Sequence, residues 1–176
     1  MKIIQTKDKK YPLKVELSNG TVLKVPKQSK FENAFLRCHG CSLMAEYLAL
    51  QYIGKHVYPL HLLQWHRTHD KADIKAKVTL RGVCKGINHY KPQRAVYDAT
   101  PTLDEMEKAL KVRDAVILEQ KNPIHSIFIF REGGLDYMIT YGKVKRISLA
   151  KIAKTATTNK TYRGMVIVKK EGVKDD

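Results

Sequence analysis

Apolar and polar residues alternate in the first stretch of the chain that has a clear pattern. The alternation runs from residue 13 to 25, on both sides of Asn19-Gly20, a dipeptide typical of two-residue hairpin turns. We therefore expect a β-hairpin over residues 13–25. Residues 26–40 show no such period, and we expect them to be irregular.

The next stretch, residues 41–54, is strongly apolar and has the period of a helix. Leu43, Tyr47 and Leu50 recur at three- and four-residue intervals, and Gly54 stands where a helix-ending glycine belongs. The pattern predicts a buried helix that begins at the first residue of this stretch.

The rest of the chain gives helical patterns first and strand patterns later. Helices are expected over residues 59–66, 79–89 and 149–153, and from the capping box of Thr102 and Glu105 to about Lys111. Strands are expected over residues 95–97, 115–118, 125–130, 135–141, 144–147 and 162–168. This order predicts an α+β fold, with N-terminal helices packed on an antiparallel sheet over residues 95–168.

Length and composition are those of one globular domain. The chain has 176 residues, so we expect a single domain over 1–176, with a frayed tail at 171–176. It contains no apolar run long enough to span a membrane and no signal peptide, so a cytoplasmic location is the default expectation. The formal charge of +16 allows contact with an anionic polymer, although a dispersed lysine surface can equally serve solubility.

Cys41 is the residue with the clearest chemical potential. A thiol at the start of a helix meets free N–H groups and the positive end of the helix dipole, which stabilise the thiolate. A nucleophilic cysteine needs this placement, whereas a buried structural cysteine does not. Cys38 and Cys84 complete an odd set of three cysteines, which argues against a disulfide framework.

A nucleophilic thiol also needs a base, and His125 is the candidate. It opens a predicted strand at the edge of the sheet, where it can face a cleft between helix and sheet. The other reading is a structural, half-buried histidine. We expect the histidines near the second helix, His61, His66 and His69, to be partly exposed, and we predict no metal site.

Several of these segments together resemble the papain-like peptidases related to bacteriocin double-glycine leader peptidases. The resemblance lies in the helix 41–54, the strand 115–118, the segment His125 to Ile129, and Gln28 in the lead-in. It implies a papain-like fold, peptide or protein substrates, no cofactor, and a nucleophile at Cys41. It also implies that His125 is the base and that Gln28 helps to hold the oxyanion.

The chain departs from the family pattern at the third catalytic position. That residue is usually Asp or Asn, whereas this chain has Ile139-Thr140-Tyr141-Gly142 there, so Thr140 and Tyr141 are the candidates to orient the imidazole. A cysteine–histidine pair can work without an acid because the thiolate is intrinsically nucleophilic. A catalytically inactive domain that binds peptides in the same cleft therefore stays open.

Two other classes of function remain as alternatives. Cys38-His39-Gly40-Cys41 has the C-x-x-C spacing of thiol–disulfide exchange, although residues 29–37 do not have the pattern of the strand that precedes this motif in that class. A nucleic-acid-binding module fits the charge, but the chain has no helix-turn-helix, zinc-knuckle or aromatic-rich strand signature.

Overall fold

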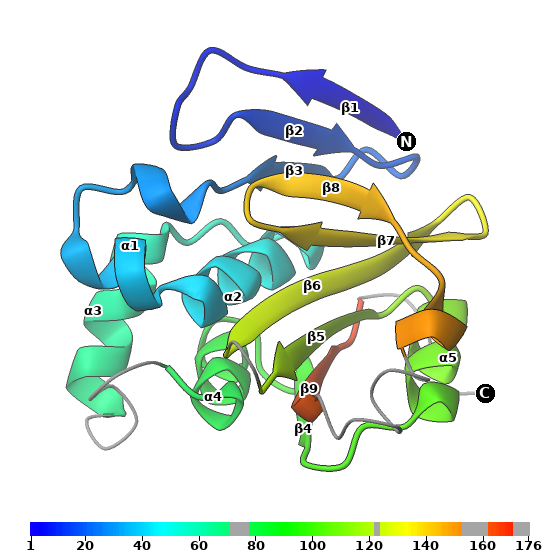
Figure 1. Ribbon diagram of the computed structural model, residues 1–176. Helices are drawn as coiled ribbons and strands as arrows, with labels where there is room; N and C mark the ends of the chain where they lie inside the picture. Colours follow the sequence, from blue (N-terminus) through cyan, green and yellow to red (C-terminus); the bar gives the residue numbers. More distant parts are fainter. Residues whose placement is uncertain (71–77, 122–123, 153–161, 171–176) are drawn as a thin grey trace.

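The computed structural model describes residues 1–70, 78–121, 124–152 and 162–170 (Figure 1). Three short antiparallel strands form a first sheet in the order β1-β2-β3, with bounds Lys2–Gln5, Leu13–Glu16 and Val22–Val25. The expected hairpin corresponds to β2 and β3, while β1 is an additional strand that pairs with the outer edge of β2. The expected frayed tail lies outside the described residues.

The lead-in to the thiol helix is ordered, so the expectation of an irregular stretch was wrong. It contains the 3-10 turn η1 (Gln28–Lys30) and the six-residue helix α1 (Ala34–His39). The side chain of Asn33 caps α1 by accepting a hydrogen bond from the N–H of Leu36. Only Leu36 is buried in α1, and a helix this short with one buried side chain leaves no period to detect.

Helices α2 (Cys41–Tyr52), α3 (Pro59–His69) and α4 (Leu80–Tyr90) follow where helical patterns predict them. All residues of α2 after the first are buried, so this helix is the centre of the fold rather than an amphipathic surface helix. No helix in the described part of the chain is long and apolar enough to cross a membrane.

A glycine makes the sharp junction between α1 and α2 possible. A Cβ atom at Gly40 would collide with the carbonyl oxygen of Leu36, so only glycine fits between the two helices. The backbone N–H of Gly40 ends α1 by donating to that same carbonyl, and its own carbonyl accepts the first hydrogen bond of α2, from Met44. This junction places Cys41 at the start of α2.

The second sheet has six antiparallel strands in the order β4-β9-β5-β6-β7-β8. Its bounds are Ala95–Asp98 for β4, Ala115–Gln120 for β5, His125–Glu132 for β6, Leu135–Thr140 for β7, Lys143–Arg146 for β8 and Tyr162–Val168 for β9. Helix α5 (Leu103–Lys111) begins with the predicted capping box, and residues 149–152 are helical.

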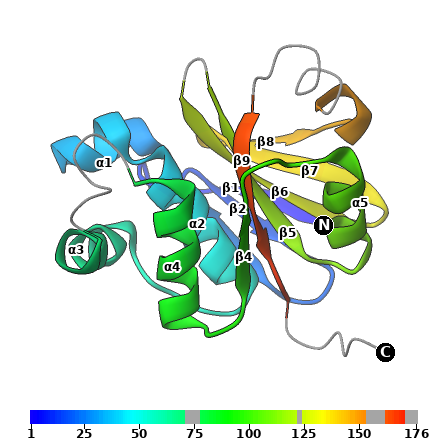
Figure 2. The ribbon, with the colours of Figure 1, turned by 90° about the horizontal axis from the view of Figure 1, so that it is seen from below.

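The six-stranded sheet is covered on both faces (Figure 2). Phe128 and Phe130 of β6 join the core shared with α2 and α4, whereas Ile127 and Ile129 join the core shared with α5. Side chains alternate across a strand, so covering both faces requires a continuous apolar run, as β5 and β6 have. Mixed helices and antiparallel strands agree with the α+β expectation.

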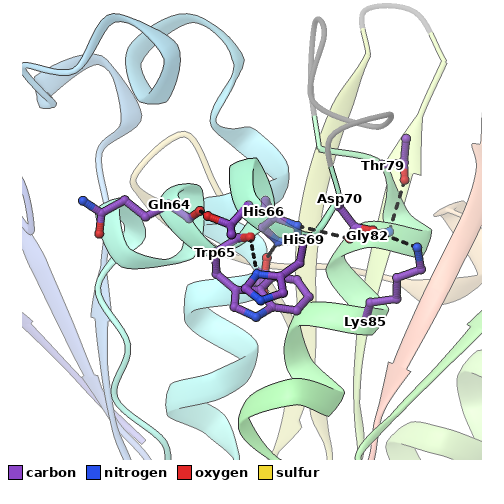
Figure 3. A network of polar contacts seen from close by, with 10 residues as sticks. Gln64, Trp65, His66, His69, Asp70, Thr79, Gly82 and Lys85 are labelled. Atoms are coloured by element: carbon purple, nitrogen blue, oxygen red, sulfur yellow. Dashed lines mark hydrogen bonds and ion pairs between the residues drawn. The ribbon is translucent and has the colours of Figure 1, made fainter.

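A buried polar network connects the three helices α2, α3 and α4, and it corrects one expectation about the histidines (Figure 3). His66 is fully buried, not partly exposed: its Nε2 lies 2.7 Å from Glu46 Oε2, and its Nδ1 lies 3.6 Å from Asp70 Oδ2. Lys85 Nζ lies 2.8 Å from Asp70 Oδ1. The expectation failed because Glu46, the carboxylate within hydrogen-bond distance of His66, comes from another helix. His61 and His69 are exposed.

Candidate active site

Cys41 is the first residue of α2, where the sequence predicts it. Its thiol is free and half-buried, and the preceding cap residue, Gly40, has no side chain that competes for the N–H groups of the first turn. These N–H groups and the helix dipole create a positive potential at the thiol. The start of α2 can therefore donate backbone hydrogen bonds to an acceptor that forms beside Cys41.

His125 is the first residue of β6 and is only 5% exposed. Its Nε2 lies 2.6 Å from the hydroxyl oxygen of Thr140, the last residue of the neighbouring strand β7. A hydroxyl can donate or accept, so this contact is compatible with either neutral tautomer of the imidazole. When Nε2–H donates to Thr140, Nδ1 is left with a free lone pair and can act as a base.

Tyr141 covers the imidazole from one side. The rings of His125 and Tyr141 are stacked, with centroids 3.9 Å apart and planes 3° from parallel. Tyr141 has a positive φ of 50° and is 59% exposed, in a two-residue turn with Gly142, whose φ is 73°. Both central residues of a type I′ hairpin turn have positive φ, which is unfavourable for a tyrosine. Tyr141 thus contacts His125 with the face of its ring, and the hydroxyl that contacts the imidazole belongs to Thr140.

Burial sets the charge of the imidazole. Desolvation lowers the pKa of His125 from its ordinary value of 6.5 to about 4. The ring is therefore neutral at pH 7, which is the state that a general base needs.

Gln28 lies in η1 and contacts the lead-in helix. Its amide Nε2 donates a hydrogen bond of 3.2 Å to the backbone carbonyl of Arg37. A carboxamide carries two N–H groups, so this bond orients the side chain and leaves one donor for another acceptor.

These side chains meet at one cleft between α2 and the sheet. Cys41, Gln28, His125, Thr140 and Tyr141 all line a hollow of about 310 Å³, counting the open solvent at its mouth. No carboxylate lines this hollow in the described part of the chain. The cleft therefore combines a thiol, a neutral imidazole and an amide donor from three separate segments of the sequence.

Two serines that sequence reasoning missed hold the cleft together. The hydroxyls of Ser42 and Ser126 are both buried and lie 3.0 Å apart. Each serine directly follows one of the two candidate catalytic residues, Cys41 and His125, so their hydrogen bond joins α2 to β6 at the cleft. In the sequence, the pair is marked only by the fact that each serine directly follows a candidate catalytic residue.

The other cysteines lie in less suitable positions. Cys38 is exposed and lies in the last turn of α1, so the C-x-x-C motif spans the junction of two helices. Cys38 has no free N–H groups of a helix start beside it, which weighs against it as the attacking thiol of a redox pair. Burial raises the pKa of the Cys84 thiol. In the segments that the structure describes, no three His, Cys, Asp or Glu side chains form a metal-binding group.

Comparison with solved structures supports this architecture. The chain superimposes on the crystal structure of a "putative C39-like peptidase" from Bacillus anthracis with a TM-score of 0.57, over 90% of this chain and 99% of that one. The fold is similar to that of a C39-like peptidase. Sequence identity over the match is 15%, so the likeness concerns the fold. No family model matches the chain, and no curated protein sequence matches it.

Proposed function

We propose that this chain is a papain-like cysteine peptidase that hydrolyses peptide bonds with Cys41 as nucleophile and His125 as base. The observation that carries the proposal is that a thiol at a helix N-terminus and a buried, neutral imidazole line the same cleft as an amide donor. The C39-like fold supports the same reaction class.

The mechanism begins with proton transfer. Nδ1 of His125 accepts the proton of the Cys41 thiol while Sγ attacks the peptide carbonyl carbon and its π electrons move onto oxygen. The backbone N–H of Cys41 and the free amide N–H of Gln28 stabilise this oxyanion. When the intermediate collapses, the C–N bond breaks and the imidazolium donates its proton to the leaving amine.

The second half of the reaction uses the same residues. A water molecule takes the place of the amine, and His125 accepts its proton as the oxygen attacks the thioester carbonyl. The carbon–sulfur bond then breaks, and Cys41 recovers its proton from the imidazolium. The chain thereby returns to its starting state with a carboxylic acid released.

Thr140 takes the orienting role that an acid or amide has in relatives of this fold. Its hydroxyl holds Nε2 of His125 but carries no negative charge, so it stabilises the imidazolium less than a carboxylate would. We therefore expect the peptidase to cleave its substrates slowly. The same neutral partner favours the second candidate, a domain that binds a peptide in this cleft without cutting it.

A peptide-cleavage assay separates the two candidates. Synthetic peptides with randomised centres, including Gly-Gly sequences because some relatives cut after this pair, are incubated with the protein and read by mass spectrometry. We expect cleavage by the native chain and by Cys38→Ala, and none by Cys41→Ala. Cys38 is the matched control because it is the other thiol of the same motif.

Binding without cleavage would overturn the peptidase proposal in favour of the inactive binder. Loss of cleavage in Cys38→Ala as strong as in Cys41→Ala would contradict the assignment of Cys41 alone as the nucleophile, whereas disulfide exchange without any cleavage, lost in either variant, would support the redox alternative.

A further inference from the structure

A second hollow adjoins the cleft and has a different chemical character. It is lined by Lys27, Gln28, Ser29, Arg37 and Tyr141, and measures about 490 Å³ with open solvent included. Gln28 and Tyr141 line both hollows, so the two are neighbours with a shared wall. The second hollow presents two cations, an amide, a hydroxyl and a phenol, and no carboxylate among the described residues lines it.

Among the residues that the structure describes, neither cation has an acidic partner. In the described segments no carboxylate lies within 4.0 Å of Lys27 or Arg37; the nearby acid Glu32 pairs instead with Lys10, at 2.9 Å. The guanidinium of Arg37 makes one long hydrogen bond, 3.4 Å, to the backbone carbonyl of Glu32. Most of its five N–H donors therefore remain available, in a geometry that suits a carboxylate.

The backbone of this hollow is firmly held. The N–H of Lys27 donates to the carbonyl of Lys10, and Arg37 accepts from the Gln28 amide through its own carbonyl. A Cβ atom at Gly142 would come 3.1 Å from the Cβ of Lys27, so the turn that carries Tyr141 packs directly against Lys27. The cations thus stand on segments fixed to the wall of the cleft, which limits the entropy lost on binding.

The position of the hollow indicates which part of a substrate reaches it. In the proposed reaction His125 donates a proton to the leaving amine, so the amine lies beside the imidazole. Tyr141 stacks on that imidazole and also lines the second hollow. The side of the cleft where the leaving amine would lie therefore adjoins the hollow that Lys27 and Arg37 line.

We propose that Lys27 and Arg37 form a subsite for a carboxylate on the leaving-group side of the scissile bond. The inference rests on the proposed peptidase function and adds a substrate class to it. The substrates are peptides that carry an acidic side chain, or the peptide's own C-terminal carboxylate, just after the cleaved bond. It also assigns a function to two of the cationic residues in a chain of net charge +16. That net charge by itself would give only a general attraction for anions.

The test uses pairs of peptides that differ in one charge. Each peptide cut by the native chain is remade with Asp or Glu in place of Asn or Gln after the cleaved bond, and each version is made with a free acid and with an amide at its C-terminus. The double variant carries both Lys27→Glu and Arg37→Glu. The single variant Lys55→Glu is the matched control. Lys55 is exposed and lies just beyond the opposite end of α2 from Cys41.

We expect the native chain and Lys55→Glu to prefer the carboxylate peptide in kcat/KM by about five- to thirtyfold, the size expected for one or two charge pairs. The double variant should lose or reverse this preference while still cutting the neutral peptides, and the native preference should shrink at high ionic strength. Preference for Asp or Glu identifies a side chain as the source of the carboxylate, and preference for the free acid identifies the C-terminus.

Two failures are distinguishable. If the native chain cuts the neutral peptides but shows no carboxylate preference, or if the double variant keeps that preference, the subsite is overturned and the peptidase stands. If the native chain cuts no peptide of either kind, the peptidase proposal falls, and the subsite falls with it.

Discussion

At the scale of single residues, the proposed chemistry depends on how His125 is held and desolvated. One neutral hydroxyl, that of Thr140, fixes Nε2, and one aromatic ring, that of Tyr141, covers the imidazole. The first contact sets the orientation of the ring and the second excludes water from it. Each contact can be removed without touching Cys41, so each has its own test.

Replacing Thr140 with Val removes the hydroxyl but keeps the shape of the side chain. We expect kcat/KM to fall by about 10- to 100-fold, the usual effect of losing a group that orients a functional histidine. Thr140→Ser keeps the hydroxyl and should retain most of the activity. Equal losses in both variants, measured on the same peptide, would mean that the side chain matters for packing and not for orientation.

Replacing Tyr141 with Ala exposes one face of the imidazole to water. Because desolvation lowers the pKa of His125 to about 4, the variant should show a higher pKa, closer to 6.5. NMR titration of the His125 ring measures this directly, and the acid limb of the pH–rate profile should move in the same direction. Tyr141→Phe keeps the ring and should leave the pKa in place; a shift of equal size there would contradict the desolvation argument.

At the scale of elements, the buried pair of Glu46 and His66 joins α2 to α3, away from the cleft. Burial raises the pKa of the Glu46 carboxyl, and His66 is its hydrogen-bond partner at 2.7 Å. A Cβ atom at Gly86 of α4 would collide with Glu46, so the three helices are closely packed around this pair. The network supports the helix that carries Cys41.

Replacing His66 with Ala should destabilise the protein by about 3–5 kcal/mol at neutral pH, because Glu46 is left without its partner. The Glu46 pKa should then rise further, so the loss grows as pH rises and shrinks as the carboxyl becomes protonated at acid pH. Denaturant titrations at several pH values measure both effects. His61→Ala, on an exposed position of the same helix, should change stability by less than about 0.5 kcal/mol. A pH-independent loss would contradict the pairing.

The elements show which features a sequence can reveal. Helix α2 and strands β5 and β6 were predictable because their apolar runs are long and the fold buries them. Strand β1 and helix α1 were not, because each is short and buries almost nothing by itself. Local patterns predict that Cys41 begins a helix and His125 a strand, as the structure has them. The contacts between Ser42 and Ser126, and between Glu46 and His66, join residues that only the tertiary fold brings together.

At the scale of the whole molecule, an excess of positive charge acts on a small folded domain. The net charge of +16 produces repulsion that the compact state feels more strongly than the unfolded chain. Lys27 and Arg37 have no acidic partner within the described segments, and they contribute to this repulsion next to the proposed active site.

Raising the ionic strength from about 0.01 M to about 0.15 M shortens the Debye length from about 30 Å to about 8 Å and so screens this repulsion. We expect the free energy of unfolding, measured by urea titration, to rise by on the order of 1 kcal/mol. A stability that is constant or falls over this range would show that attractive ion pairs outweigh the net charge.

The proposed peptidase requires Cys41 and His125 to act as a pair, and differential alkylation measures this pairing. Iodoacetamide is added at pH 7, and mass spectrometry follows each cysteine in the native chain and in His125→Ala. We expect Cys41 to react at least about tenfold faster than Cys38 and to lose this advantage in the variant, since the base that accepts its proton is gone. If Cys41 reacts no faster than Cys38, or equally fast without His125, the pair does not exist and the peptidase account is wrong.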